Sequence, residues 1–192
     1  MSTEENKAVV GRWFTEFWGK DFNPAVIDEL AAPDIRFEYS LHAPLRGRDA
    51  VRAFAKKFRG AFPDLNFWGT ADLIAEGDYV VGRWEGGGTH TGDAFDDMPY
   101  GPLPAGTGKV MRFTGTTVLK VENGLITEEI GLDDGVTALD QLGHIAKACA
   151  REEPAQKARQ APAHRRRRGL AHRLVTASRL GPVRRPRCLG SP

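Results

Sequence analysis

The hydrophobic period of this chain changes at Pro63-Asp64, and this change restricts the fold more than any other feature. Before it, apolar residues recur mostly every three or four positions, as on one side of a helix; after it they mostly alternate, as on one face of a strand. Helices followed by a run of strands are typical of an α+β domain with its helices on one face of a largely antiparallel sheet.

Three helices are predicted before Pro63. The first is capped by Thr3 and ends at Gly19, and its apolar stripe consists of Val10, Trp13, Phe14, Phe17 and Trp18. The second is short and stops before Pro33, and the third follows Gly47. A further short helix is expected to close the domain, with Val136, Leu139, Leu142 and Ile145 on its apolar side.

A first strand, Asp34–Leu41, lies between the second and third predicted helices. Four strand-like runs follow Pro63, namely Leu65–Ile74, Tyr79–His90, Met111–Glu122 and Leu125–Leu132. The Asn123-Gly124 pair predicts a tight hairpin between the last two. Residues 92–108 hold four glycines and three prolines. A connection of that length in a compact domain is usually a lid or a binding loop.

Parity along the strand from Tyr79 points to a cavity or to a bend. Trp84 shares its face with His90 and with three glycines, Gly82, Gly86 and Gly88. Missing side chains leave room for a ligand inside a curved sheet, but the same pattern is typical of a bulge at a sheet corner. Both interpretations stand.

Two acids share a face of the last strand: Glu129 and Asp133, with Gly131 between them. A carboxylate in an apolar pocket has a raised pKa and can act as a general acid or base. Alternatively both are surface groups at a sheet edge. We favour this surface interpretation for Glu129, whereas for Asp133 the surface and the acid–base interpretations are equally supported. His90 is either an acid–base group or a hydrogen-bonded structural histidine.

No metal or cofactor is expected. Both cysteines, Cys149 and Cys188, lie beyond the predicted domain, and the histidines lack metal-ligand spacing. The chain has no phosphate loop and no dinucleotide fingerprint.

Several short motifs in this order resemble the SnoaL-like polyketide (ester) cyclases, within the wider nuclear transport factor 2-like superfamily. They are Arg46-Gly47 before Asp49-Ala50-Val51-Arg52-Ala53-Phe54, Ala61-Phe62-Pro63-Asp64, Gly88-Thr89-His90-Thr91-Gly92, Phe113-Thr114-Gly115 and Val121-Glu122-Asn123-Gly124-Leu125-Ile126. The resemblance runs from about Glu4 to Ile145 and covers none of the residues after it.

The resemblance implies a cone-like curved mixed sheet with three N-terminal helices around a pocket, and dimers or tetramers packed through the sheet. It also implies a cofactor-free and metal-free ring closure by intramolecular aldol condensation, with an aspartate of the last strand as the acid–base group. His90 matches a histidine of such cyclases. The family's aspartate aligns with Gly131, so Asp133, two residues on and on the same face, is the candidate here.

The predicted catalytic residues are therefore Asp133 and His90, and the predicted pocket residues are Trp13, Phe37, Trp84, Glu129 and Gly131. The expected substrate is a small apolar carbonyl compound. A non-catalytic small-molecule binder, or a hydrolase, isomerase or dehydratase on the same fold, is the alternative.

Charge divides the chain into a domain of residues 1–146 and a tail of residues 147–192. The first part carries 14 Lys and Arg against 23 Asp and Glu, and the second carries 13 against 2. We expect the Arg/Pro/Ala-rich tail to be disordered, without specific nucleic-acid binding because it lacks aromatic residues. With no signal-peptide core and no long apolar run, a cytoplasmic protein without membrane contact is expected.

Overall fold

The computed structural model describes residues 1–98 and 100–145. The chain divides into two units, Met1–Cys149 and Ala150–Pro192. The predicted disordered tail, with Cys149 and Cys188, lies outside the described residues, so those predictions and the domain boundary at residue 146 stay predictions.

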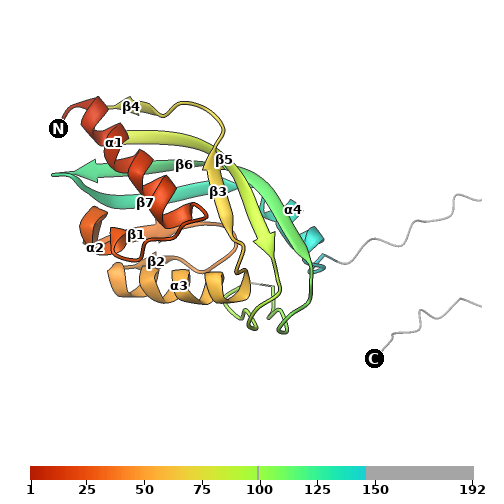
Figure 1. The fold of residues 1–192 in the computed structure, drawn as a ribbon. Coiled ribbons are helices and arrows are strands. Elements are labelled where there is room, and N and C mark those ends of the chain that lie inside the picture. The colour runs from red at the N-terminus through yellow and green to blue at the C-terminus, as the bar shows by residue number, and fades with distance from the viewer. Residues whose placement is uncertain (99, 146–192) are drawn as a thin grey trace, which may run out of the picture. The chain divides into compact units, whose positions relative to one another are not determined.

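Helices gather at the N-terminal end of the chain, as the hydrophobic period predicts. They are α1 (Thr3–Trp13), the π-helix η1 (Phe14–Trp18), α2 (Val26–Leu30), α3 (Arg48–Ala61) and, after the strands, α4 (Gly135–Gln141). In Figure 1, α1, α2 and α3 lie against the sheet. α4 lies at the end of the long strands of the sheet that is away from α1.

Seven strands form one curved mixed sheet, which confirms the predicted α+β class. They are β1 (Ala31–Glu38), β2 (Leu45–Arg46), β3 (Asn66–Gly69), β4 (Ile74–Glu76), β5 (Tyr79–Thr89), β6 (Val110–Glu122) and β7 (Leu125–Asp133). Their order is β2-β1-β7-β6-β5-β3, with β4 also paired to β5. All pairs are antiparallel except β1 with β7, which brings the end of β1 beside the end of β7.

The cap of the first helix lies one residue earlier than predicted. Ser2, not Thr3, is the N-cap: its hydroxyl accepts a hydrogen bond from the Glu5 amide at 3.2 Å, and the Glu5 carboxylate accepts one from the Ser2 amide at 2.7 Å. This reciprocal arrangement needs a Glu or Gln side chain three residues after the cap, and Glu5 stands at that spacing from Ser2. The residue three after Thr3 is Asn6, which lacks the carboxylate, so the prediction of Thr3 as the cap was wrong.

The last predicted turn of this helix is a π-helix. A π-helical turn closes hydrogen bonds between residues five apart, so Trp13 and Trp18 come to lie on the same side. Gly19 follows, where any Cβ would collide with the Thr15 carbonyl. The widened turn is what directs two indole rings toward the sheet.

Two strand predictions needed correction. The run predicted as one strand over Leu65–Ile74 forms two short strands, β3 and β4, with residues 70–73 between them. The strand predicted over Asp34–Leu41 begins instead at Ala31, because the backbone on both sides of Pro33 pairs with β7.

The glycines of β5 make room for protein. A Cβ on Gly82 would collide with the Phe14 ring, one on Gly86 with the backbone of β3, and one on Gly88 would crowd Asp64. Neighbouring segments, and not a ligand, therefore occupy the space over these glycines, and β5 pairs with β6 from Tyr79 to Thr89 without a register shift. The structure supports neither the ligand space nor the bulge at this strand.

The glycine- and proline-rich connection between β5 and β6 is anchored at its middle. Phe95 and Leu103 exchange two backbone hydrogen bonds of 3.0 and 2.8 Å, and their side chains are buried together with Met98. The loop thus contributes three apolar side chains to the core of the domain.

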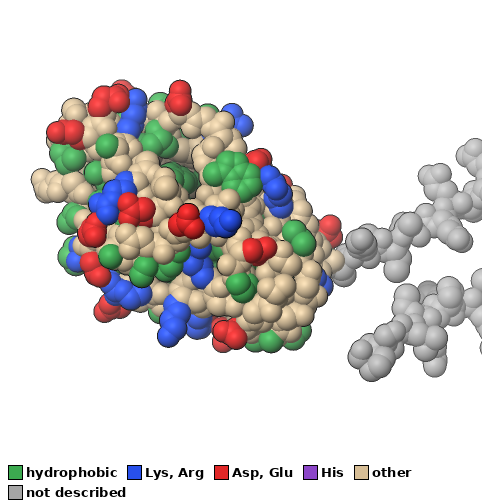
Figure 2. Space-filling view, in the orientation of Figure 1, with side chains coloured by type: hydrophobic (Ala, Val, Ile, Leu, Met, Phe, Trp, Pro, Cys, Tyr) green, Lys and Arg blue, Asp and Glu red, His purple; other side chains and the backbone are tan. Residues whose placement is uncertain are grey.

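Charged side chains of both signs lie on the surface. Figure 2 shows acidic and basic side chains interspersed over one face of the molecule. Val118 and Leu132, on the outer face of β6 and β7, are 41% and 82% exposed. The expected dimer or tetramer through this face stays a prediction. Of the described helices, none has the length and apolarity to span a bilayer.

Arg59 on α3 ties that helix to the end of η1. Its guanidinium donates hydrogen bonds to the carbonyls of Phe17 at 2.6 Å and Gly19 at 2.9 Å, and it stacks on the Phe22 ring at 4.5 Å. Partial burial lowers the pKa of Arg59 to about 10, so it is a cation at neutral pH. It supplies donors to carbonyls that the helix end leaves without partners.

We predict that Arg59→Met lowers the free energy of unfolding by about 2–3 kcal/mol, because it leaves the Phe17 and Gly19 carbonyls without their charged donor. Urea denaturation of the full chain measures this. The matched control is Arg52→Met on the same helix, whose ion pairs with Asp28 and Asp49 are exposed; it should cost less than about 1 kcal/mol. Equal losses in both variants would contradict the assignment.

Candidate functional site

A carboxylate is buried at the centre of the sheet. Glu129 of β7 has no exposed surface and accepts hydrogen bonds from the indole nitrogens of Trp13 and Trp18, both at 2.7 Å, and from the Tyr39 hydroxyl at 2.5 Å. Both carboxylate oxygens therefore have partners. The interpretation of Glu129 as a surface group was wrong.

Burial raises the pKa of Glu129 from 4.5 to about 7, although its three hydrogen bonds oppose the shift. The same burial, together with the Glu129 charge, raises the pKa of the Tyr39 hydroxyl well above its usual value. Tyr39 is therefore a neutral donor at physiological pH. Within the cluster of Glu129, Trp13, Trp18 and Tyr39, Glu129 and Trp13 have no exposed surface. The cluster links the N-terminal helices and the end of β1 to the last strand.

The hydrogen-bond network continues across the sheet through Thr117. The Tyr39 hydroxyl lies 3.1 Å from the Thr117 hydroxyl, which accepts a hydrogen bond from the Trp84 indole at 2.8 Å. Each of the two rings lies over a glycine: a Cβ on Gly131 would collide with Tyr39, and one on Gly115 would collide with Trp84. The space over Gly131 is therefore filled by the Tyr39 ring.

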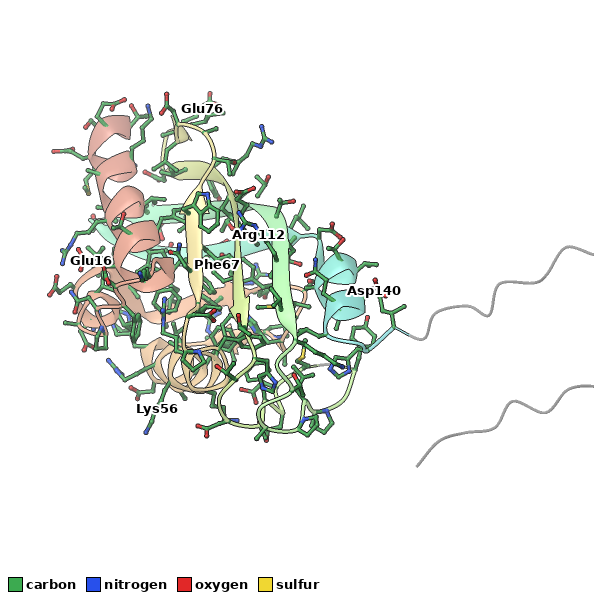
Figure 3. The ribbon with its side chains drawn as sticks, turned by 45° about the vertical axis from the view of Figure 1, so that its right-hand side comes forward. Glu16, Lys56, Phe67, Glu76, Arg112 and Asp140 are labelled. Atoms are coloured by element: carbon green, nitrogen blue, oxygen red, sulfur yellow. The ribbon has the colours of Figure 1, made fainter. Side chains whose placement is uncertain are left out.

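Beside these rings lies a cavity with an almost wholly apolar wall. Its volume is about 40 Å³, taken as the space open to the centre of a water-sized sphere. Its apolar and aromatic wall consists of Phe14, Trp18, Tyr39, Leu41, Phe54, Phe58, Phe62, Phe67, Trp84, Phe95, Met98, Met111, Phe113 and Leu142. Figure 3 labels one of them, Phe67, on β3. Phe95 and Met98 come from the long loop, so the loop contributes to the cavity wall.

Asp133 is the acid on this wall. It stands at the end of β7, is half-buried, and accepts hydrogen bonds from the Ser40 hydroxyl and from the Ser40 amide at 3.3 Å. Burial raises its pKa, while the bonds to Ser40 and the nearby His42 oppose the shift. A carboxylate fixed by its neighbours on an apolar wall has the surroundings of a general base.

His42 also lines the cavity. It lies in the segment after β1, is 6% exposed, and packs against the Phe54 ring at 4.3 Å between centroids. Its Nδ1 lies 2.7 Å from the Ala43 carbonyl oxygen; because that oxygen only accepts, Nδ1 carries the hydrogen. Burial lowers the pKa of His42, so the ring is neutral at pH 7 and its Nε2 is an acceptor.

His90 lies outside this wall. It is fully buried, with Nε2 donating to the Asp93 carbonyl at 2.9 Å and Nδ1 within 2.9 Å of the Thr107 hydroxyl. Its amide and carbonyl pair with Lys109 and Gly108. Both ring nitrogens are thus engaged with the two ends of the long loop, which gives His90 a position suited to holding that loop.

Comparison with known proteins identifies the fold. The sequence model of the SnoaL-like polyketide cyclases matches residues 8–142. The chain belongs to this family. A search among curated proteins gave no match.

Solved structures share the SnoaL-like fold. A candidate SnoaL-like polyketide cyclase from Jannaschia sp. CCS1 superposes with a TM-score of 0.61 at 22% identity, over 73% of this chain and 92% of that one. AclR, a candidate hydroxylase from Streptomyces galilaeus, gives 0.59 at 23%, over 76% and 89%. A ketosteroid isomerase-like protein from Catenulispora acidiphila, in complex with trimethylamine, gives 0.53 at 20%, over 70% and 92%.

Of the predicted site residues, the SnoaL-like domain brings Asp133 and Trp84 to the cavity wall. Trp13 and Glu129 lie in the buried cluster, Phe37 is fully buried between Phe17 and Trp18, and Gly131 lies beneath Tyr39. In residues 1–98 and 100–145, no group of three or more His, Cys, Asp or Glu is arranged to hold a metal ion.

Sequence reasoning missed four polar members of the site: Tyr39, Ser40, His42 and Thr117. Tyr39 has a detectable signal, since it shares strand parity with Ile35 and Phe37. Ser40 and His42 lie in an irregular segment without a period, and their approach to Asp133 depends on the parallel pairing of β1 with β7.

We predict that the free energy of unfolding falls by up to about 3 kcal/mol as pH rises from about 4 to about 8, because folding raises the pKa of Glu129 from 4.5 to about 7. Well below pH 4.5 the carboxyl group is protonated in both states; between the two pKa values it is ionised in the unfolded chain and protonated in the folded protein. Urea denaturation at a series of pH values measures the fall, and Glu129→Gln should remove it. Glu128→Gln, on the outer face of the same strand, should retain it. An unchanged pH dependence in Glu129→Gln would refute the shift.

Proposed function

We propose that this SnoaL-like protein carries out cofactor-independent acid–base chemistry on a small apolar carbonyl compound, with intramolecular aldol ring closure as the reaction. The observation that supports this most is Asp133, a half-buried carboxylate with a raised pKa on the wall of an aromatic cavity. The family match supports the reaction class.

In the proposed reaction Asp133 takes a proton from the carbon next to a carbonyl group. The resulting enolate carbon bonds to a second carbonyl carbon of the same molecule, and the alkoxide so formed takes the proton back from Asp133. Ser40 holds the carboxylate in place through its hydroxyl and amide. The aromatic wall excludes water, which strengthens the electrostatic interactions that stabilise the enolate.

A non-catalytic binding function is the alternative. It is favoured by Gly131, which offers no acid at the position where the family's aspartate aligns, and by the Tyr39 ring that fills the space above it. A hydrolase, isomerase or dehydratase would use the same cavity with a different substrate, since one fold hosts many reactions.

We predict that the full chain converts at least one member of a panel of aromatic β-keto methyl esters to a cyclised product of unchanged mass. Asp133→Asn should lower this turnover by about 100-fold or more, because it removes the proton acceptor. Chromatography with mass detection measures the conversion. The control is Asp140→Asn, an exposed acid on α4 labelled in Figure 3, which should leave turnover unchanged.

Circular dichroism must show that Asp133→Asn is folded. Full activity in folded Asp133→Asn would exclude this residue as the base. If neither the wild type nor Asp133→Asn turns the esters over, but both bind them, the result would favour the binding function.

A further inference from the structure

His42, one of the residues that line the cavity, has a buried ring nitrogen without a hydrogen-bond partner. In the part of the chain that the structure describes, three buried side-chain atoms lack a hydrogen-bond partner: Asn6 Oδ1, His42 Nε2 and His144 Nε2. Of these residues, only His42 lines the aromatic cavity. A buried polar atom without a partner costs free energy, so its presence on a cavity wall needs a reason.

The neighbours of His42 fix what this atom can do. Nδ1 is committed as a donor to the Ala43 carbonyl, which leaves Nε2 as the lone-pair acceptor of a neutral ring. The ring is held by Phe54 and by Phe37, at 4.3 and 5.5 Å between centroids. Neither phenylalanine can donate a hydrogen bond to it.

We propose that His42 is a specificity-determining residue that accepts a hydrogen bond from a hydroxyl group on an aromatic ligand. The ligand class is therefore a planar aromatic compound with a phenolic or enolic hydroxyl: its rings pack against the aromatic wall, and its hydroxyl supplies the donor that Nε2 lacks. This inference deepens the proposed function, since a phenolic or enolic carbonyl compound would place its reacting carbon beside Asp133.

The chemistry also predicts which ligands are rejected. An ether of the same shape has no donor and leaves Nε2 unpaired in the complex, whereas the hydroxyl compound satisfies it. Discrimination on this basis is stronger than on size alone, because the unpaired acceptor stays desolvated.

The test compares 2-naphthol with 2-methoxynaphthalene, which share a ring system and differ in the donor. Calorimetric titration of the full chain should give a dissociation constant about 10-fold lower for 2-naphthol. In His42→Phe, which keeps an aromatic ring in place, the two compounds should bind equally, and the affinity for 2-methoxynaphthalene should stay near that of the wild type.

Asp133→Asn separates the two acceptors of the cavity. If His42 accepts the hydrogen bond from the ligand hydroxyl, the Asp133→Asn variant still prefers 2-naphthol to 2-methoxynaphthalene. A preference that survives in His42→Phe, or one lost in Asp133→Asn alone, would assign the hydroxyl to another acceptor and overturn the proposal. Equal binding of the two compounds to the wild type, or no binding of 2-naphthol, would also overturn it.

This binding test is independent of turnover. A wild type that prefers 2-naphthol through His42 but converts no ester would support the role of His42 and reject the aldol reaction. Turnover that depends on Asp133, without a hydroxyl preference, would support the reaction and reject the role of His42.

Discussion

The buried carboxylate of Glu129 is the interaction on which the rest of the structure depends. Burying a charged group without hydrogen-bond partners costs free energy of folding. Here the indoles of Trp13 and Trp18 and the phenol of Tyr39, all from the N-terminal half of the chain, supply the compensating hydrogen bonds. Trp13 and Trp18 reach it together only because the helix widens to a π-turn between them. The N-terminal helices, the first strand and the last strand are thereby fixed in one arrangement around a single group.

Three alternate residues on one face of the last strand have different surroundings. Glu129 is buried in the core, Gly131 leaves space for the Tyr39 ring, and Asp133 lines the cavity. The ring over Gly131 also separates the two acids: Tyr39 donates to Glu129 on one side and forms part of the cavity wall on the other. In our account, therefore, the acid of the proposed reaction lies two residues farther along the strand than the position at which the family's aspartate aligns.

Much of this fold could be predicted from sequence, because helix and strand periods are local and strong in the first helix, in α3 and in the long strands. The face shared by Glu129 and Asp133 also followed from parity, but their burial did not. Burial depends on partners over a hundred residues away, such as Trp13, and on a π-turn that leaves no clear pattern. His42 was missed for the same reason: its segment is irregular, and only the pairing of β1 with β7 brings it to the cavity.

We assign the two acids different roles, Glu129 in the scaffold and Asp133 at the ligand. Carboxyl ¹³C NMR of the full chain tests this assignment directly, with the two signals assigned from Glu129→Gln and Asp133→Asn and recorded before and after addition of 2-naphthol. We expect the Asp133 signal to shift on binding and the Glu129 signal to stay unchanged. A shift of Glu129 with Asp133 unchanged would contradict these roles and would place the ligand against the buried cluster.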